Sequence, residues 1–325
     1  MTENNSIFET VFDEITTPYQ YGVVLRPSGI AGAPDSDAVD CPTVFEHDGR
    51  FYMTYVCHNG QGYNTGIAVS DDLLNWEKLG VILDMGKSGC WDEFNAAGFP
   101  ICEYKWGEIP RLHKRDGYFY MPYIGSNEPG YECGVISMGM SRSRSLLTGW
   151  ERITDEPVMR PEMPYEGIKL WKQFVIFDGE KYIDYYNAGS APEQICTAFS
   201  HDLLNWTRHD NNPIIGTTQT NEGMWGQHIS GDPNNIQKIC GVWVMFYFTD
   251  TPDGFLDSFA VSDDLLNWKK SHIPLTNRNN GYDSTYAHKP CVIKHKETVY
   301  HYYCATGSEG RVIALKHGAR GYAAF

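Results

Sequence analysis

Ionisable residues recur at one position of an internal repeat of this chain, eight residues before a predicted turn. The five copies place the following residues there: Asp40, Glu108, Leu170, Asp232 and His288. Three of these five residues are carboxylic acids. Two carboxyl groups that meet in space can protonate a leaving oxygen and activate water or attack carbon, which is the chemistry that cleaves glycosidic bonds. Crowding of such acids raises the pKa of at least one of them.

Carboxylates at strand ends can also have a structural role, because they cap loops and form salt bridges. For any one of the three acids, this role explains the residue as well as catalysis does. Neither turn chemistry nor core packing requires acids at the same position of three copies. We therefore predict that Asp40, Glu108 and Asp232 are catalytic and converge on one site.

Two sequence patterns make up the repeat that would position these acids. The first is an Asp-Gly turn, or a related pair, between runs of alternating apolar residues. Because the turn needs a positive φ, which glycine adopts readily, this pattern predicts a β-hairpin. The second pattern is Ser-Asp-Asp-Leu-Leu-Asn-Trp, found with one variation at 70–76, 200–206 and 262–268 and in degenerate form at 145–150. It predicts a turn into an outer strand, with its Leu and Trp packed between neighbouring sheets.

Five copies of one unit in 325 residues predict radial repetition of small sheets. We expect an all-β chain that forms a five-bladed β-propeller with four-stranded antiparallel blades. It would be a single catalytic domain over residues 1–325, with residues 1–20 as an N-terminal arm. A β-sandwich or a jelly roll would not explain five copies. In a propeller the residues before the innermost strands converge at one end of the central channel, so the acids would meet there.

Composition narrows the classes of partner. The formal net charge is −15 and no basic cluster is present, so we expect neither nucleic acid nor a membrane as partner. A small neutral oligosaccharide or glycoside fits better; aromatic residues reach 14%, and sugar rings stack on them, although β-sheets favour them too. The nine cysteines lack zinc spacing and no secretion signal is recognisable, which indicates reduced thiols and a cytoplasmic location. The oligomeric state stays open.

The chain resembles the five-bladed-propeller glycoside hydrolases, especially families 43 and 117 and more distantly 32, 68 and 130. The resemblance rests on Asp40-Cys-Pro with Asp48-Gly, on Asp232-Pro233 and on His288. It implies a general base on the first blade, a Glu that acts as general acid on the fourth blade, and a further carboxylate on the third blade. At that third-blade position this chain has Leu170. Rotation of the pattern makes Glu108 the acid, Asp232 the base and Asp40 the supporting carboxylate. Without rotation Asp40 is the base, so the base stays open between Asp40 and Asp232.

The resemblance also implies a reaction. Families 43 and 117 invert the anomeric carbon, so we expect an inverting, exo-acting hydrolase of short oligosaccharides with arabinofuranoside, xyloside or galactoside ends. One alternative is a glycoside phosphorylase that uses inorganic phosphate, as in family 130. The other alternative is a non-catalytic carbohydrate-binding propeller.

Other residues are candidates for substrate binding. Two inserts that precede the second and fourth blades offer aromatic and polar side chains, and basic residues would line the channel. The candidates are Trp91, Arg111, Trp171, Lys172, Trp225, His228, His288 and Lys289. Surface loops anchored by a Trp, and lysines paired with the carboxylates, are the structural alternatives. Glu93 and Glu222 are reserve acids. No cofactor is required; the resemblance alone implies Ca²⁺ or another cation in the channel, with His288 as its ligand.

Overall fold

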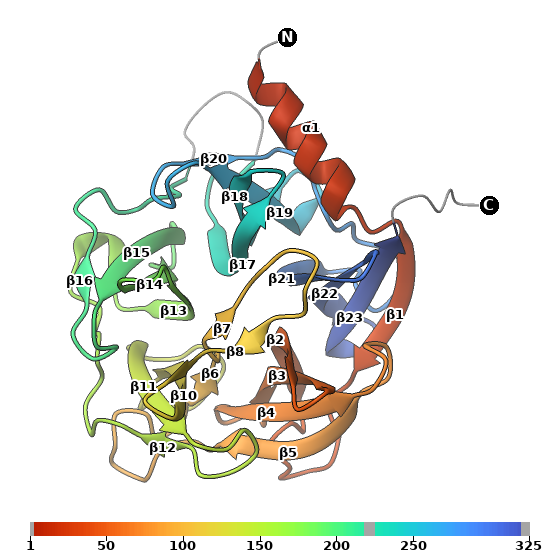
Figure 1. The fold of residues 1–325 in the computed structure, drawn as a ribbon. Helices are drawn as coiled ribbons and strands as arrows, with labels where there is room; N and C mark the ends of the chain where they lie inside the picture. The colour runs from red at the N-terminus through yellow and green to blue at the C-terminus, as the bar shows by residue number, and fades with distance from the viewer. Residues whose placement is uncertain (1–2, 218–224, 320–325) are drawn as a thin grey trace.

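The computed structural model describes residues 3–217 and 225–319, and this part of the chain is nearly all β. Its strands form five antiparallel groups in chain order (Figure 1). The first three groups consist of β2 (Ala38–His47), β3 (Arg50–His58), β4 (Tyr63–Ser70) and β5 (Glu77–Leu83), then β6 (Ala97–Gly98), β9 (Lys114–Arg115), β10 (Tyr118–Gly125), β11 (Ser137–Ser143) and β12 (Glu151–Arg152), then β13 (Leu170–Phe177), β14 (Tyr182–Ala188), β15 (Gln194–Ser200) and β16 (Thr207–Arg208). A short hairpin of β7 (Cys102–Glu103) and β8 (Arg111–Leu112) interrupts the second group.

The last two groups bring the ends of the chain together. They consist of β17 (Ser230–Ile239), β18 (Val242–Thr251), β19 (Gly254–Ser262) and β20 (Trp268–Lys270), then β21 (Tyr286–His295), β22 (Thr298–Gly307) and β23 (Gly310–Ala319). The N-terminal strand β1 (Tyr19–Leu25) pairs antiparallel with β23 and so completes the fifth group. The predicted N-terminal arm contains helix α1 (Glu3–Ile15), whose buried Val11 and Ile15 pack on the fourth and fifth groups. A 3₁₀ turn, η1 (Pro164–Glu166), precedes β13.

The hydrophobic core is divided among the spaces between neighbouring groups. One cluster of buried residues fills each of the five spaces. The cluster that joins the fifth group to the first includes Tyr302 and Met53, so the packing closes a ring. Figure 1 shows the groups around a common centre, with β2, β13, β17 and β21 on the inner side of their groups. This arrangement brings the first strands of distant chain segments together.

The predicted hairpin turns are confirmed. Asp48 and Asp116 have φ of 47° and 51°, and the glycine after each also has positive φ. The strands on either side of each turn pair directly, as His47 does with Arg50. Each turn therefore reverses the direction of the chain between two paired strands.

The Ser-Asp-Asp-Leu-Leu-Asn-Trp segments are also turns that lead into outer strands, as predicted. In each turn the carboxylate of the aspartate at the third position accepts backbone N–H groups. For example, Asp202 Oδ1 accepts the N–H of Leu204 at 2.9 Å and that of Asn205 at 2.8 Å. Leu73 carries a positive φ of 66°, and its carbonyl accepts the Tyr302 hydroxyl of the neighbouring group at 2.6 Å. The Trp76 ring lies edge-on to the same tyrosine. The repeat thus fastens neighbouring groups to each other.

Within the described residues, no helix is both long enough and apolar enough to span a membrane.

We predict that Asp202→Ala lowers the free energy of unfolding by about 1 kcal/mol, because two backbone N–H groups lose their acceptor. Asp72→Ala and Asp264→Ala should give similar losses, since the same bonds recur there. Urea denaturation measures each change. Asp210→Ala, at an exposed aspartate in the next turn, serves as control. Losses no larger than the control's would contradict a structural role for this turn.

Candidate active site

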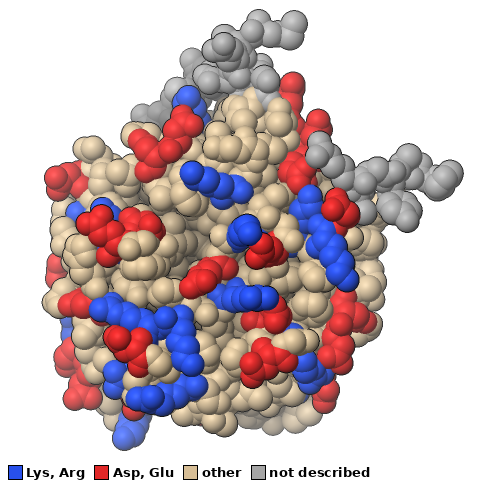
Figure 2. Space-filling view, in the orientation of Figure 1, with Lys and Arg blue, Asp and Glu red and all other residues tan. Residues whose placement is uncertain are grey.

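A cavity of about 280 Å³ lies at the centre of the strand groups. Acidic and basic side chains gather at the middle of the face shown in Figure 2. The acidic, basic and histidine side chains that line the cavity are Asp40, Glu132, Lys172, Glu193, Asp232, His288, Lys289 and Arg311. Aromatic rings form much of the remaining wall, among them Tyr63, Trp171 and Phe248. The cavity therefore combines an apolar wall with convergent polar groups, as ligand sites do.

Bulges turn these side chains toward the cavity. The register of β2 shifts between Asp40 and Thr43, and β13, β17 and β21 shift at their corresponding ends. Cys41, Asp232 and Lys289 have φ of 46°, 49° and 64°, which is unusual for residues other than glycine. A bulge re-aims the side chains beside it, and strained backbone of this kind clusters at functional sites.

Asp40 is the most constrained carboxylate. Its Oδ2 accepts from Lys289 Nζ at 2.9 Å and from Arg311 Nη1 at 2.8 Å, and its Oδ1 accepts the Cys41 N–H at 2.8 Å. Burial alone would raise the pKa of Asp40, but Lys289 and Arg311 hold that pKa well below its usual value. Asp40 is therefore ionised, and both of its oxygens already have partners within the protein.

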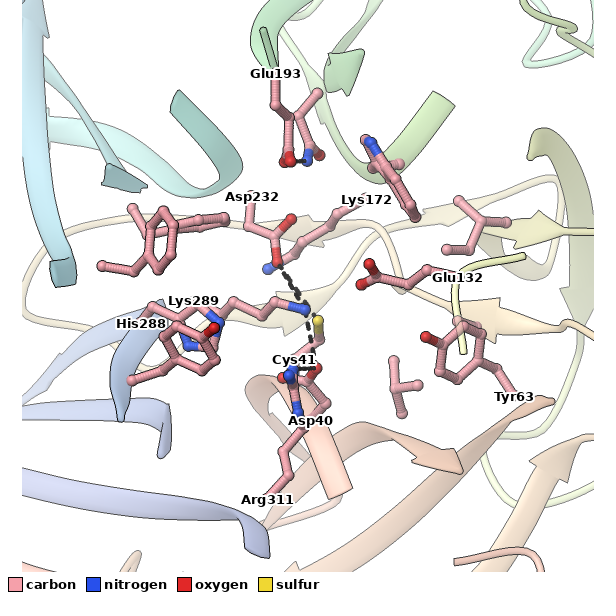
Figure 3. Close-up of a pocket in the computed structure, with 18 of the residues that line it drawn as sticks. Asp40, Cys41, Tyr63, Glu132, Lys172, Glu193, Asp232, His288, Lys289 and Arg311 are labelled. Atoms are coloured by element: carbon pink, nitrogen blue, oxygen red, sulfur yellow. Dashed lines mark hydrogen bonds and ion pairs between the residues drawn. The ribbon is translucent and has the colours of Figure 1, made fainter. Parts of the chain in front are cut away.

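Asp232 shares Lys289 with Asp40. The Lys289 Nζ lies 3.8 Å from Asp232 Oδ2, and the Cys41 thiol donates to the same oxygen at 3.6 Å (Figure 3). Burial would lower the pKa of Lys289, but Asp40 and the other acidic groups around it raise that pKa well above its usual value. One protonated lysine thus holds two carboxylates that are distant in the sequence in one cluster.

Glu193 is a carboxyl group in a different electrostatic state. Burial and then the charge of Asp232 raise the pKa of Glu193 to about 8, so that it carries a proton at neutral pH. The Asn187 Nδ2 donates to Glu193 Oε1. A Cβ atom at Gly231 would lie only 2.4 Å from that oxygen, so glycine is what lets this carboxyl group approach the backbone beside Asp232.

Glu132 reaches the cavity from the loop 126–136. Gly130 N–H donates to the Gln61 carbonyl at 2.7 Å, and Lys169 Nζ donates to the Glu132 carbonyl at 2.7 Å. The Tyr131 ring lies 4.9 Å from the Arg311 guanidinium. These contacts hold the loop across the cavity, and Figure 3 shows the Glu132 carboxylate directed into it.

Six of the residues predicted from the sequence line this cavity: Asp40, Trp171, Lys172, Asp232, His288 and Lys289. Glu108 does not, and the prediction that it lies with Asp40 and Asp232 is wrong. Its side chain is 60% exposed and pairs with Lys105. The physical reason is a break in the inner strand of the second group, where 97–101 and 114–115 pair with different halves of β10. The intervening loop carries Glu108 away from the cavity.

Four other candidates for substrate binding also lie elsewhere in the described structure. Trp91 stacks on Tyr123 with ring centroids 5.6 Å apart, and Arg111 pairs with Glu46 at 3.1 Å. The Trp225 ring lies 5.9 Å from that of His272. His228 is 77% exposed and pairs with Asp250 at 3.1 Å. These side chains have packing or surface partners, so their predicted place in the cavity is wrong.

Neither reserve acid takes part in the cavity as described. Glu93 accepts from the Ser88 hydroxyl at 3.0 Å and from the Gly89 N–H at 2.8 Å, both within its own loop. Glu222 lies outside the described residues.

The surroundings of His288 do not fit the expected cation. Burial, Lys289 and Arg311 lower the pKa of His288 to about 3, which places two positive charges near the imidazole. Over residues 3–217 and 225–319, no group of three His, Cys, Asp or Glu side chains is arranged to hold a metal ion. His288 is therefore uncharged at neutral pH and lines the cavity wall.

Glu132 and Glu193 escaped the sequence analysis because it considered only residues before the first strand of each group. Both lie in loops that join the second strand of a group to its third. In antiparallel sheets these loops open on the same face as the start of the first strand. The acids in loops 126–136 and 189–193 could therefore have been predicted from the sequence to lie at the cavity.

No family model and no curated protein sequence matches this protein. Solved structures do. A structure described as a complex of BT0996 with RGII has 32% sequence identity over 98% of this protein and 97% of its own length, with a TM-score of 0.86. Another, described as "Glycoside hydrolase", has 31% identity over 100% of this protein and 98% of its own length, also with a TM-score of 0.86.

More distant structures share the fold alone. A family 117 glycoside hydrolase from the marine bacterium Zobellia galactanivorans has 13% identity, a TM-score of 0.67, and coverage of 96% of this protein and 93% of its own length. Structures from glycoside hydrolase families 43 and 130 are also similar.

We predict that Asp40→Asn lowers the free energy of unfolding by about 3–5 kcal/mol, because Lys289 and Arg311, which are only 11% and 17% exposed, lose their counter-charge. Urea denaturation at neutral pH measures the loss. Asp71→Asn removes the same charge from an exposed pair with Arg50 and should leave the denaturation midpoint near that of the wild type. Equal midpoints for the two variants would contradict a stabilising role for the Asp40 cluster.

Proposed function

Since the chain belongs to the propeller-fold glycoside hydrolases and is a glycosidase, we propose that it removes the terminal sugar from a short neutral oligosaccharide, with Glu193 and Asp232 as its working carboxyl groups. One observation carries this proposal. A carboxyl group with a raised pKa lies beside an ionised cluster in a single cavity. Such a difference in protonation is what distinguishes acid from base in a glycosidase.

Glu193 is the proposed general acid, in place of Glu108. A general acid must hold its proton until the leaving oxygen takes it, and a pKa near the working pH suits that task. Asn187 donates to Glu193 Oε1, which leaves the other oxygen to carry the proton into the cavity.

Asp232 is the proposed base. Asp40, the other residue that the sequence allowed, has both oxygens engaged by Lys289, Arg311 and the Cys41 N–H. Asp232 has longer contacts, at 3.6 and 3.8 Å, and both of these are to Oδ2. Its Oδ1 is therefore the better placed to accept a proton from water. Asp40 would act as the supporting carboxylate that keeps Lys289 and Arg311 in place.

The shape and charge of the cavity support exo-action on a neutral end group. A compact cavity of about 280 Å³ admits the end of an oligosaccharide, whereas an internal unit needs a groove that runs across the surface. Lys289 and Arg311 already bind Asp40, which disfavours them as a phosphate site and favours hydrolysis over phosphorolysis. A similar structure is described as a complex with RGII, which supports an oligosaccharide as the substrate class. Arabinofuranoside, xyloside and galactoside ends remain the proposed types.

Further parts of the proposal concern architecture, stereochemistry and location. We interpret the five strand groups as five blades of one catalytic domain, with β6 and β9 together as the inner strand of the second blade. We expect inversion at the anomeric carbon, which proton NMR of the first-formed sugar would test. None of the nine cysteines forms a disulfide bond in the described structure, which suits a reducing cytoplasmic location.

We predict that Glu193→Gln and Asp232→Asn each lower kcat/KM by about 100-fold to 10,000-fold, as expected on loss of a general acid or base. The assay compares 2,4-dinitrophenyl with phenyl glycosides of arabinofuranose, xylose and galactose. The acid variant should recover activity on the dinitrophenyl substrates, because that leaving group needs no proton. The base variant should lose activity on both.

Glu108→Gln is the matched control and should stay near wild-type activity, because Glu108 is exposed and outside the cavity. If Glu132→Gln lost more activity than Asp232→Asn, the role of base would pass to Glu132. Equal losses on both leaving groups for Glu193→Gln would contradict its role as the acid.

The raised pKa of Glu193 predicts a limb in the pH profile of kcat/KM. The acid must be protonated, so activity should fall as the pH rises through about 8. An ordinary glutamic acid, with a pKa of about 4.3, would lose its proton far lower. The limb should disappear in Glu193→Gln measured on dinitrophenyl glycosides. A limb that persists in this variant would assign it to another group.

A further inference from the structure

Lys172 is a buried cation without a hydrogen-bond partner among the described residues. Its side chain lines the cavity and is only 2% exposed. No acceptor in the described structure lies within hydrogen-bond distance of its Nζ, which sits 5.6 Å from the centre of the Phe99 ring. Figure 3 shows the ammonium group pointing into the cavity beside Asp232. Burial of a donor without a hydrogen bond costs free energy, so we expect this ammonium group to bind a ligand.

Asn187 offers the complementary group from the neighbouring strand. Its Nδ2 donates to Glu193, whereas its buried Oδ1 has no donor in the described residues. The two side chains lie at one level of the sheet. Leu170 pairs with Ala188 and Gln173 with Tyr186, so a bulge places Trp171 and Lys172 across from Asn187. A cation that donates and an amide oxygen that accepts thus both line the cavity from adjacent strands.

The chemistry of this pair selects its ligand. A sugar hydroxyl group both accepts and donates a hydrogen bond, so it can satisfy the ammonium and the amide oxygen together. A fully charged ligand is a poorer match. Among the lining residues the three cations Lys172, Lys289 and Arg311 face three ionisable acids besides protonated Glu193, so the cavity offers no surplus positive charge.

We propose that Lys172 and Asn187 form the subsite that binds a hydroxyl group of the terminal sugar and so determine which sugars are accepted. The proposal deepens the proposed function and rests on it for the identity of the ligand as a glycoside. Asn187 would take part in both sugar binding and the positioning of the acid, because its amide group contacts the sugar through Oδ1 and Glu193 through Nδ2. A sugar that lacks this hydroxyl group would leave both buried groups unpaired and would be rejected.

The first test measures binding without catalysis. Thermal unfolding of the wild type and of Lys172→Met is followed with and without free L-arabinose, D-xylose and D-galactose. We expect at least one sugar to raise the Tm of the wild type and to leave that of Lys172→Met unchanged. Lys238→Met is the matched control, since Lys238 also lies over a ring, that of Trp243, but outside the cavity. It should keep the wild-type response.

The second test uses turnover of the best phenyl glycoside and its monodeoxy analogues. Lys172→Met should lower kcat/KM by about 10-fold to 100-fold, as expected for a hydrogen bond to a charged group. Removal of the bound hydroxyl group should cost the wild type a similar factor and should cost Lys172→Met nothing further. Lys172→Gln, which keeps an N–H donor, should recover part of the activity.

The outcomes separate this inference from the proposed function. A Tm response to sugar that persists in Lys172→Met, or no response of the wild type to any of the three sugars, would overturn the subsite. So would a deoxygenation cost that is equal in the wild type and Lys172→Met at every position. A wild type that binds sugar through Lys172 but hydrolyses no glycoside would instead contradict the proposed hydrolysis.

Discussion

The structure of the cavity depends on one ammonium group that is largely shielded from solvent. Lys289, from the first strand of the fifth group, lies 2.9 Å from Asp40 of the first group and 3.8 Å from Asp232 of the fourth. A buried charge is tolerated only when it is paired, so burial of these charged groups requires the three strands to stay together. The ring of packed sheets supplies that proximity, and its closure by β1 and β23 holds the first and last segments in place.

Four carboxyl groups in one cavity differ because their surroundings differ. Asp40 has two cations on one oxygen and is held ionised. Glu193 has an amide for a partner and an ionised neighbour, so its proton is retained. Gly231 enables this difference, because any side chain there would displace the Glu193 carboxyl group from its place beside Asp232. Protonation is therefore set by position within the ring rather than by residue type.

A similar structure at 13% sequence identity is evidence for the fold alone, whereas one at 32% identity is also evidence for the family. The distant similarity reflects packing of repeated sheets, which many sequences can satisfy, whereas function lies in the side chains that a fold positions. The third strand group of this protein illustrates how side chains can differ within a shared fold. It has Leu170 where other groups have an acid or a histidine, yet it supplies Lys172, Asn187 and Glu193 to the cavity from neighbouring positions.

The sequence by itself determined the repeated turns, the outer-strand segments and the places of Asp40, Asp232, His288 and Lys289, because short-range turn chemistry and the two-residue period of strands fix these features locally. It misplaced Glu108, since a hairpin inserted into an inner strand keeps the residue count but changes the path of the backbone. Only the tertiary structure brought Glu132 and Glu193 to the cavity. The protonation of Glu193 depends on the charge of Asp232, which is distant in the sequence. Because Coulomb interactions act through space, no local pattern could have assigned the acid.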